Sequence, residues 1–243
     1  MMHYVEDLEY NMDINGVNLQ GVNIVSPTST LVTGNLLFNL DMQNYVSGLT
    51  WLDTSGNGNN FTFYATPTVV NTGTSTAYWS SPGNNGAVAA SAIFPANTNY
   101  SKGVVFLYTG ATFSNLIGST TQETFWGAAT TFLQAGNNNG DGYQVVSSNP
   151  NAVTANTWTY VSMNFSGTTG WTLYINGVAR GSSATTTNRS AASTPQIFSY
   201  SGNANQTIGK CAAAHLYTRT LSAEEHLQNY NYYATRYSGS TPA

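Results

Sequence analysis

The chain has 243 residues, of which 41% are hydrophobic, 13% are aromatic and only 7% are charged, and its net charge is −4. This apolar content excludes a disordered chain, and six basic residues against ten acidic ones exclude a phosphate-binding surface for nucleic acid. Because charged residues usually make up about a quarter of a globular protein, this surface must consist mainly of Asn, Ser, Thr, Gly and Tyr, which tolerate packing against copies of the same chain.

The cysteine content and the N-terminal sequence bear on where the chain is made. Cys211 is the only cysteine, so we expect no intrachain disulfide and synthesis in a reducing cytosol. The first residues are acidic and lack the basic and apolar regions of a secretory signal peptide. Since no apolar run approaches the length of about 18 residues that a membrane span requires, we expect no membrane partner.

Residues 1–33 differ in pattern from the rest of the chain. Their apolar residues are separated by Asn, Gly and Gln at a spacing too irregular for a helix, and Ser26-Pro27 closes the segment. We expect an N-terminal anchoring arm, held against the domain or against a neighbouring subunit. Residues 34–243 are expected to form one domain.

From Gly34 onward, short apolar runs alternate with turn sequences, which predicts strands joined by tight turns. The runs that we expect to be strands lie at residues 36–40, 51–53, 104–108 and 124–127. Residues 137–142, of sequence NNNGDG, are a strong turn signal between two further strand candidates. Short strands at this spacing are typical of a sandwich or barrel.

The clearest local prediction is a pair of strands at residues 158–165 and 171–175. In the second strand, Trp171, Leu173 and Ile175 share one face because side chains alternate along a strand. Asn176-Gly177 then supplies the two residues with positive φ that a type I′ hairpin turn requires.

One helix is predicted, close to the C-terminus. Residues 222–225, of sequence SAEE, form a capping box in which the Ser222 hydroxyl and the Glu225 carboxylate satisfy each other's backbone N–H groups. Leu227, Tyr230, Ala234 and Tyr237 then recur at helical spacing. We expect this helix to end near residues 237–239 and to lie across an edge of the sandwich, with that apolar stripe as its packing face.

Several of these motifs, taken in order, resemble a known family. They are LFNLD at 37–41, WLDTSGNGNN at 51–60, TWTYV at 157–161, WTLYING at 171–177, TIG at 207–209 and AHLYTRTLSAEE at 214–225. This order is similar to that of laminin G-like jelly-roll domains in the concanavalin A-like lectin and glucanase superfamily, and it covers about residues 34–237. The resemblance implies an all-β, concanavalin A-like jelly-roll sandwich of two antiparallel sheets with one short C-terminal helix. Versions with both the opening and the closing motifs occur in phage and large-virus structural proteins.

The sequence shows no pattern of catalytic residues. The superfamily's glycoside hydrolases carry clustered carboxylates, and that reaction requires two carboxyl groups that flank the scissile bond. The acidic residues of this chain are scattered, or lie in the arm or the helix cap: Glu6, Asp7, Glu9, Asp13, Asp41, Asp53, Glu123, Asp141, Glu224 and Glu225. His3, His215 and His226 belong to no nucleophile motif, and Cys211 is interpreted as a core residue. We therefore expect no catalytic site and no enzyme activity.

Calcium is the one metal that the residues allow. Asp53 with Asn57, or Asp141 with Asn137 and Asn139, supplies the oxygen ligands that this ion prefers. The alternative is that Asp53 forms an Asx turn and that the second loop is a hairpin tip. Since a single carboxylate per loop binds calcium weakly, the alternative is preferred and no cofactor is expected.

Exposed Tyr and Trp residues among Asn and Ser fit a sugar-binding surface and equally fit a protein interface. Trp51, Trp126, Trp158 and Trp171 lie on predicted strands and are expected in the core, whereas Trp79 is left unassigned.

Two hypotheses for the function follow. The first is a non-enzymatic viral structural protein of the capsid-decoration or fibre type, made in the host cytoplasm and located on the exterior of the virion. It would display a lectin-like domain through the arm, with other virion proteins and copies of itself as partners and a cell-surface glycan as a ligand to be tested. The alternative is a free-standing carbohydrate-binding module of cellular origin.

Overall fold

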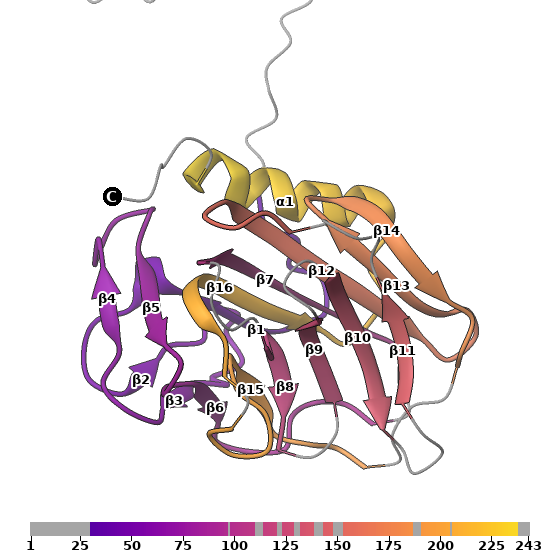
Figure 1. Cartoon of the computed structure of the whole chain (residues 1–243), viewed down its shortest axis with the longest axis horizontal. Helices are drawn as coiled ribbons and strands as arrows, with labels where there is room; N and C mark the ends of the chain where they lie inside the picture. The colour runs from indigo at the N-terminus through magenta and orange to yellow at the C-terminus, as the bar shows by residue number, and fades with distance from the viewer. Residues whose placement is uncertain are drawn as a thin grey trace, which may run out of the picture.

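A computed structural model describes residues 30–96, 98–109, 114–120, 123–128, 132–138, 143–147, 153–186, 191–204 and 206–237. Two layers of antiparallel β-sheet make up this part of the chain, and one α-helix lies against the outside of the larger layer (Figure 1). The predicted all-β sandwich of two antiparallel layers with one C-terminal helix is therefore confirmed.

The larger layer is an eight-stranded sheet in which every neighbouring pair is antiparallel. Its strands, in spatial order, are β14 (Val178–Ser183), β13 (Gly170–Ile175), β12 (Trp158–Ser166), β7 (Tyr100–Tyr108), β16 (Ile208–Tyr217), β5 (Tyr78–Pro82) and β4 (Thr68–Val70), with β1 (Leu36–Asp41) beside the second half of β16. A bulge at Ala212 divides β16, because Cys211 pairs with Phe106 whereas Ala213 pairs with Val105. The bulge lies where the partner of β16 changes from β5 to β1.

The smaller layer combines two groups of strands. The first group contains β2 (Thr50–Trp51), β3 (Phe61–Phe63), β6 (Ala87–Ala89), β15 (Pro195–Ile197) and β8 (Ile117–Ser119), and the second contains β9 (Glu123–Ala128), β10 (Phe132–Asn138) and β11 (Tyr143–Ser147). The backbone N–H of Leu116 donates to the carbonyl of Phe125 at 2.7 Å and joins the two groups. A short 3-10 helix, η1 (Met42–Asn44), follows β1.

The core between the layers is rich in aromatic residues. Trp51, Trp79 and Trp171 have no exposed surface, which confirms two of the predicted core tryptophans and assigns Trp79 to the core. The prediction that Trp158 lies in the core was wrong, because its side chain is partly exposed and faces away from the core. On β12 the inward positions belong to Val161 and its alternate neighbours, so Trp158 shares the outward parity. The Trp126 side chain lies outside the described part of the chain.

The predicted hairpins are confirmed where the structure describes them. In β12 and β13, Phe165 pairs with Trp171, and the next turn has φ of 49° at Asn176 and 77° at Gly177. These positive angles explain the residue types at the turn. At residues 137–142, the strands β10 and β11 pair as expected of a hairpin, while the tip lies outside the described residues.

Helix α1 (Ala223–Tyr237) begins with the predicted capping box. The Ser222 hydroxyl accepts from the N–H of Glu225 at 3.2 Å, and the Glu225 carboxylate accepts from the N–H of Ser222 at 2.9 Å. The predicted position was wrong, because the helix packs on the outer face of the larger sheet, above β12, β7 and β16, rather than along an edge (Figure 1). Of the predicted apolar stripe, the helix buries only Tyr237. The other residues that it buries are His226, Asn229 and Tyr233, whereas Leu227 is 44% exposed.

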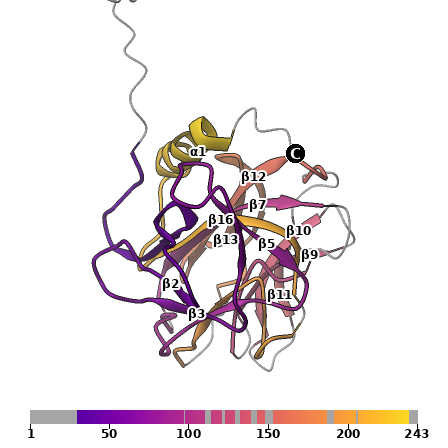
Figure 2. The same ribbon diagram turned by 90° about the vertical axis from the view of Figure 1, so that its left-hand side faces the viewer.

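Only the end of the expected N-terminal arm belongs to the described part of the chain. From residue 30, the segment passes beside α1 before it enters β1 (Figure 2). Leu31 packs against the cluster of side chains beneath the helix, and Val32 against Tyr217 and Leu221. Residues 1–29 lie outside the described residues, so the anchoring role of the arm stays a prediction.

Candidate functional site

The interface between α1 and the sheet is polar as well as aromatic. His226 is fully buried and is hydrogen-bonded through Nδ1 to the Ser162 hydroxyl at 2.8 Å and through Nε2 to Asn164 Oδ1 at 3.0 Å. On β16, two strands from β12, His215 Nε2 lies 2.9 Å from the Tyr160 hydroxyl. The Tyr174 ring stacks on His226 at 3.8 Å between centroids. Each imidazole therefore has polar partners and an aromatic neighbour within the interior.

Burial sets the charge state of both histidines. Desolvation, with a smaller contribution from the nearby His226, lowers the pKa of His215 to about 3. Desolvation also lowers the pKa of His226 to about 3, against a smaller opposing effect of Glu225. Both imidazoles are therefore neutral at physiological pH. The hydrogen bonds of His226 to Ser162 and Asn164 hold α1 on the sheet.

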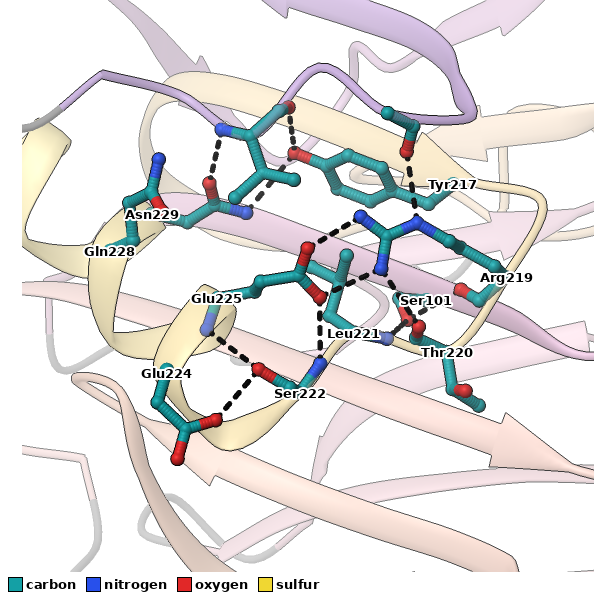
Figure 3. Close-up of polar contacts among 12 residues, drawn as sticks. Ser101, Tyr217, Arg219, Thr220, Leu221, Ser222, Glu224, Glu225, Gln228 and Asn229 are labelled. Carbon is teal, nitrogen blue, oxygen red and sulfur yellow. Dashed lines mark hydrogen bonds and ion pairs between the residues drawn. The ribbon is translucent and has the colours of Figure 1, made fainter.

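Side chains of β16, α1 and the loop between them hold the backbone of the segment that precedes β1 (Figure 3). Asn229 Oδ1 accepts from the N–H of Val32 at 2.9 Å, and the Tyr217 hydroxyl donates to the Val32 carbonyl at 2.8 Å. Gln228 donates to the carbonyl of Thr30 at 2.8 Å. We call this set of contacts the arm clamp. Because its hydrogen bonds go to backbone atoms, it fixes the path of the segment independently of the side chains there.

The described carboxylates have structural partners. Asp41 forms a bidentate ion pair with Arg236, whose side chain is 9% exposed, and Glu225 forms one with Arg219. The hydrogen bond from Arg219 lowers the pKa of Glu225. Glu224 accepts from the Ser222 hydroxyl. The side chains of Glu123 and Asp141, together with Glu6, Asp7, Glu9 and His3, lie outside the described part of the chain.

The first calcium candidate has the geometry of the alternative that the sequence favoured. Asp53 Oδ1 accepts from the N–H groups of Asn39 and Ser55, and Oδ2 accepts from the Ser55 hydroxyl and the N–H of Asn59. This is the predicted Asx turn. The side-chain amide of Asn57 donates to the carbonyls of Leu36 and Leu37. In the described ranges, no three His, Cys, Asp or Glu side chains gather into a metal-binding group. The candidate at Asp141, Asn137 and Asn139 lies outside the described side chains.

A groove runs between α1 and the outer face of the larger sheet. It is lined by Val105, Trp158, Thr159, Tyr160, Tyr230, Tyr233, Ala234 and Tyr237. Tyr230, Ala234 and Tyr237 belong to the stripe that the sequence predicted as the packing face of the helix. Of these, Tyr230 and Ala234 are partly exposed, whereas Tyr237 is buried against the sheet at the end of the groove. We call this feature the aromatic groove.

The aromatic surface continues from the groove across the sheet. Trp158 packs against Tyr237 at 4.7 Å between ring centroids and against Tyr78 at 5.6 Å. Lys210 places its ammonium 4.7 Å above the centre of the Tyr78 ring. The sequence analysis did not single out Tyr78 or Lys210. Their shared face follows from strand alternation only after the pairing of β5 with β16 is known.

Two antiparallel layers carrying a half-exposed aromatic groove define a lectin-like β-sandwich. A family model named Laminin_G_3 and described as the Concanavalin A-like lectin/glucanases superfamily matches residues 54–225, and the chain belongs to this family. The resemblance stated from the sequence motifs is therefore confirmed. No curated protein sequence matches the chain.

Solved structures with the same fold include carbohydrate-binding and receptor-binding domains. Domain 4 of AbnA, an extracellular GH43 arabinanase from Geobacillus stearothermophilus solved in complex with arabinotriose, has a TM-score of 0.62 at 15% identity, over 80% of this chain and 98% of that one. The binding domain of botulinum neurotoxin DC was solved with rat synaptotagmin II and with SialylT. These two structures have TM-scores of 0.65 at 13% and 12% identity, over 83% of this chain and 52% of theirs. The chain thus spans about half of the toxin domains, and the likeness shows the fold.

Proposed function

We propose that this chain is a non-catalytic carbohydrate-binding module whose ligand lies in the aromatic groove. The observation that carries the proposal is the partly exposed pair Tyr230 and Ala234, which lines the groove opposite Trp158 together with the buried Tyr237. Exposed aromatic side chains beside polar groups are typical of recognition surfaces rather than of the solvent-facing side of a helix. Sugar rings have apolar faces that pack on such side chains, while tyrosine hydroxyls hydrogen-bond sugar hydroxyls.

Two further observations support binding without catalysis. AbnA domain 4, which has the same fold, was solved with arabinotriose. In the described part of this chain, Asp41 and Glu225 are engaged by arginines and Asp53 by backbone N–H groups, and none of the three lines the aromatic groove. A pair of carboxylates flanking a bound sugar, as glycoside hydrolysis requires, is therefore not a feature of the groove.

A glycan array followed by calorimetry on the full-length protein tests this function. Tyr230→Ala should weaken saccharide binding about fivefold, because it removes one stacking ring worth about 1 kcal/mol. Tyr232→Ala is the matched control, since Tyr232 lies on the same helix and does not line the groove. No bound saccharide on the array, or equal losses in the two variants, would overturn the proposal.

We propose further that the module is displayed on the exterior of a virion through the arm of residues 1–33. The low charged fraction, which permits close packing of like subunits, and the arm clamp, which fixes the direction in which the chain leaves the domain, support this role. The expected partners are other virion proteins and copies of this chain.

Light scattering on the full chain and on a chain beginning at Thr30 tests the role of the arm. The shortened chain keeps the arm clamp, so its fold should be preserved. An oligomeric full chain with a monomeric shortened chain supports assembly through the arm. Two monomers that both bind saccharide favour the free-standing module of cellular origin instead.

A further inference from the structure

One row of outward-facing residues crosses the larger sheet beside the aromatic groove. Trp158 pairs with Leu107, Leu107 with Lys210, and Lys210 with Ser80, so these four residues lie side by side on β12, β7, β16 and β5. Leu107 is fully buried although it faces outward, so neighbouring side chains cover it. Above the row, Trp158 contacts the Tyr78 ring and Tyr78 contacts the Lys210 ammonium, so these three side chains connect the groove to Lys210.

Lys210 is the cation of this surface. Of the other cations in the described part of the chain, Arg219 and Arg236 are engaged by carboxylates and Lys102 is buried in the core, which leaves Lys210 and Arg180 without a described carboxylate partner. The Lys210 ammonium rests on the Tyr78 ring at 4.7 Å, and that ring packs edge-on against Trp158. An ammonium has three donors, so contact with one ring face leaves donors for an anion.

We infer that the ligand of the aromatic groove is an acidic saccharide, whose carboxylate or sulfate group binds Lys210 while a neighbouring sugar ring packs on Trp158. This inference rests on the proposed function and adds the chemical class of the ligand. Lys210 and Trp158 lie two strands apart, a separation of roughly 10 Å from the usual strand spacing. That distance fits two linked sugar rings better than one.

The charges around the row favour an anion at this cation. Residues 30–243 contain six basic and six acidic residues, so the domain carries no net negative charge that would repel an anionic ligand. Near the row, the Asp41 carboxylate is neutralised by Arg236, whose guanidinium lies 5.3 Å from the Tyr237 ring. No carboxylate in the described part of the chain therefore competes with an anionic ligand for Lys210.

The test pairs each acidic oligosaccharide with a neutral counterpart of the same backbone. Uronic-acid and sialylated probes are compared with their methyl esters, and sulfated probes with their desulfated forms, by calorimetry on the full-length protein. The native chain should bind at least one acidic probe about tenfold more tightly than its neutral counterpart. Lys210→Gln should remove that preference without weakening the neutral probe, and added salt should weaken only the acidic one.

Arg180→Gln is the matched control. It removes the same charge from an exposed position on β14, four strands from β16, and should leave the preference intact. Neutral probes that bind equally well to the native chain and to Lys210→Gln, with no acidic preference, would overturn the inference and leave the proposed function standing. An equal loss in Arg180→Gln would also overturn it, since the attraction would then be unspecific. If no probe of either kind binds, the proposed function itself fails.

Discussion

Lowering the pH from 7 to 5 should destabilise the domain through His215 and His226. Both imidazoles are fully buried, and desolvation lowers the pKa of each to about 3 in the folded chain, against about 6.5 in an unfolded chain. The unfolded state therefore takes up protons first as the pH falls. Stability is complete above the unfolded pKa and is lost progressively between pH 6.5 and pH 3.

The size of this effect follows from the two pKa values. A histidine in the unfolded chain is protonated at pH 5, because this pH is about 1.5 units below its pKa. The same histidine stays neutral when it is buried in the folded chain. Each histidine thus reduces the free energy of unfolding by about 2 kcal/mol, and the pair by about 4 kcal/mol. The pKa of Glu225 is lowered from 4.5 by the hydrogen bond from Arg219. Protonation of such carboxylates therefore reduces the free energy of unfolding only at a pH lower than the range in which the histidines act.

Urea unfolding at pH 7 and at pH 5 measures this loss, with fluorescence of the buried Trp51, Trp79 and Trp171 as the signal. His226→Gln keeps an amide near Ser162 and Asn164, and it should show about half of the pH dependence of the native chain. A free energy of unfolding that is equal at pH 7 and pH 5 would refute the reasoning. So would a His226→Gln variant with the full dependence, because a different group would then be titrating.

Three further substitutions test the contacts that hold α1 in place. Asp41→Asn leaves the buried Arg236 guanidinium without its counter-charge and should cost about 3 kcal/mol in urea unfolding, and a loss below 1 kcal/mol would contradict the ion pair. Asn229→Ala should cost about 2 kcal/mol and speed amide hydrogen exchange at Val32, whereas unchanged exchange would argue against the arm clamp. Ser222→Ala removes the N-cap and should lower the free energy of unfolding by about 1 kcal/mol, with Ser222→Asp near native as its control.

The sequence predicted those parts of the fold that depend on local backbone chemistry. Asn176-Gly177 adopts the positive φ angles that only a few residue types tolerate, and Ser222 with Glu225 forms a cap within one helical turn. Such features need no knowledge of distant strands. The pairing of β1 and β5 with opposite halves of β16 joins residues more than 100 positions apart, and no local pattern reveals it.

The packing face of α1 was missed for a physical reason. The face that contacts the sheet is formed largely by hydrogen-bonded polar residues such as His226 and Asn229, which a search for apolar spacing passes over. The apolar stripe found by that search, with Tyr230 and Ala234, lines the aromatic groove instead. The prediction for Trp158 failed for a related reason. The helix partly covers the outer face of β12, so this strand carries large side chains on both of its faces.

The contacts of α1 place the arm clamp and the aromatic groove on different sides of the helix. Gln228 binds the end of the arm at Thr30, and Tyr230 lines the aromatic groove, at positions about 200° apart around the helix axis. A ligand in the groove and the segment at residue 30 therefore occupy opposite sides of one helix. Gln228→Ala should loosen the arm, seen as faster hydrogen exchange at Val32, and leave saccharide affinity unchanged, whereas Tyr230→Ala should do the reverse. A change in both readouts from either substitution would show that the two sides are coupled, and the helix would then transmit ligand binding to the arm.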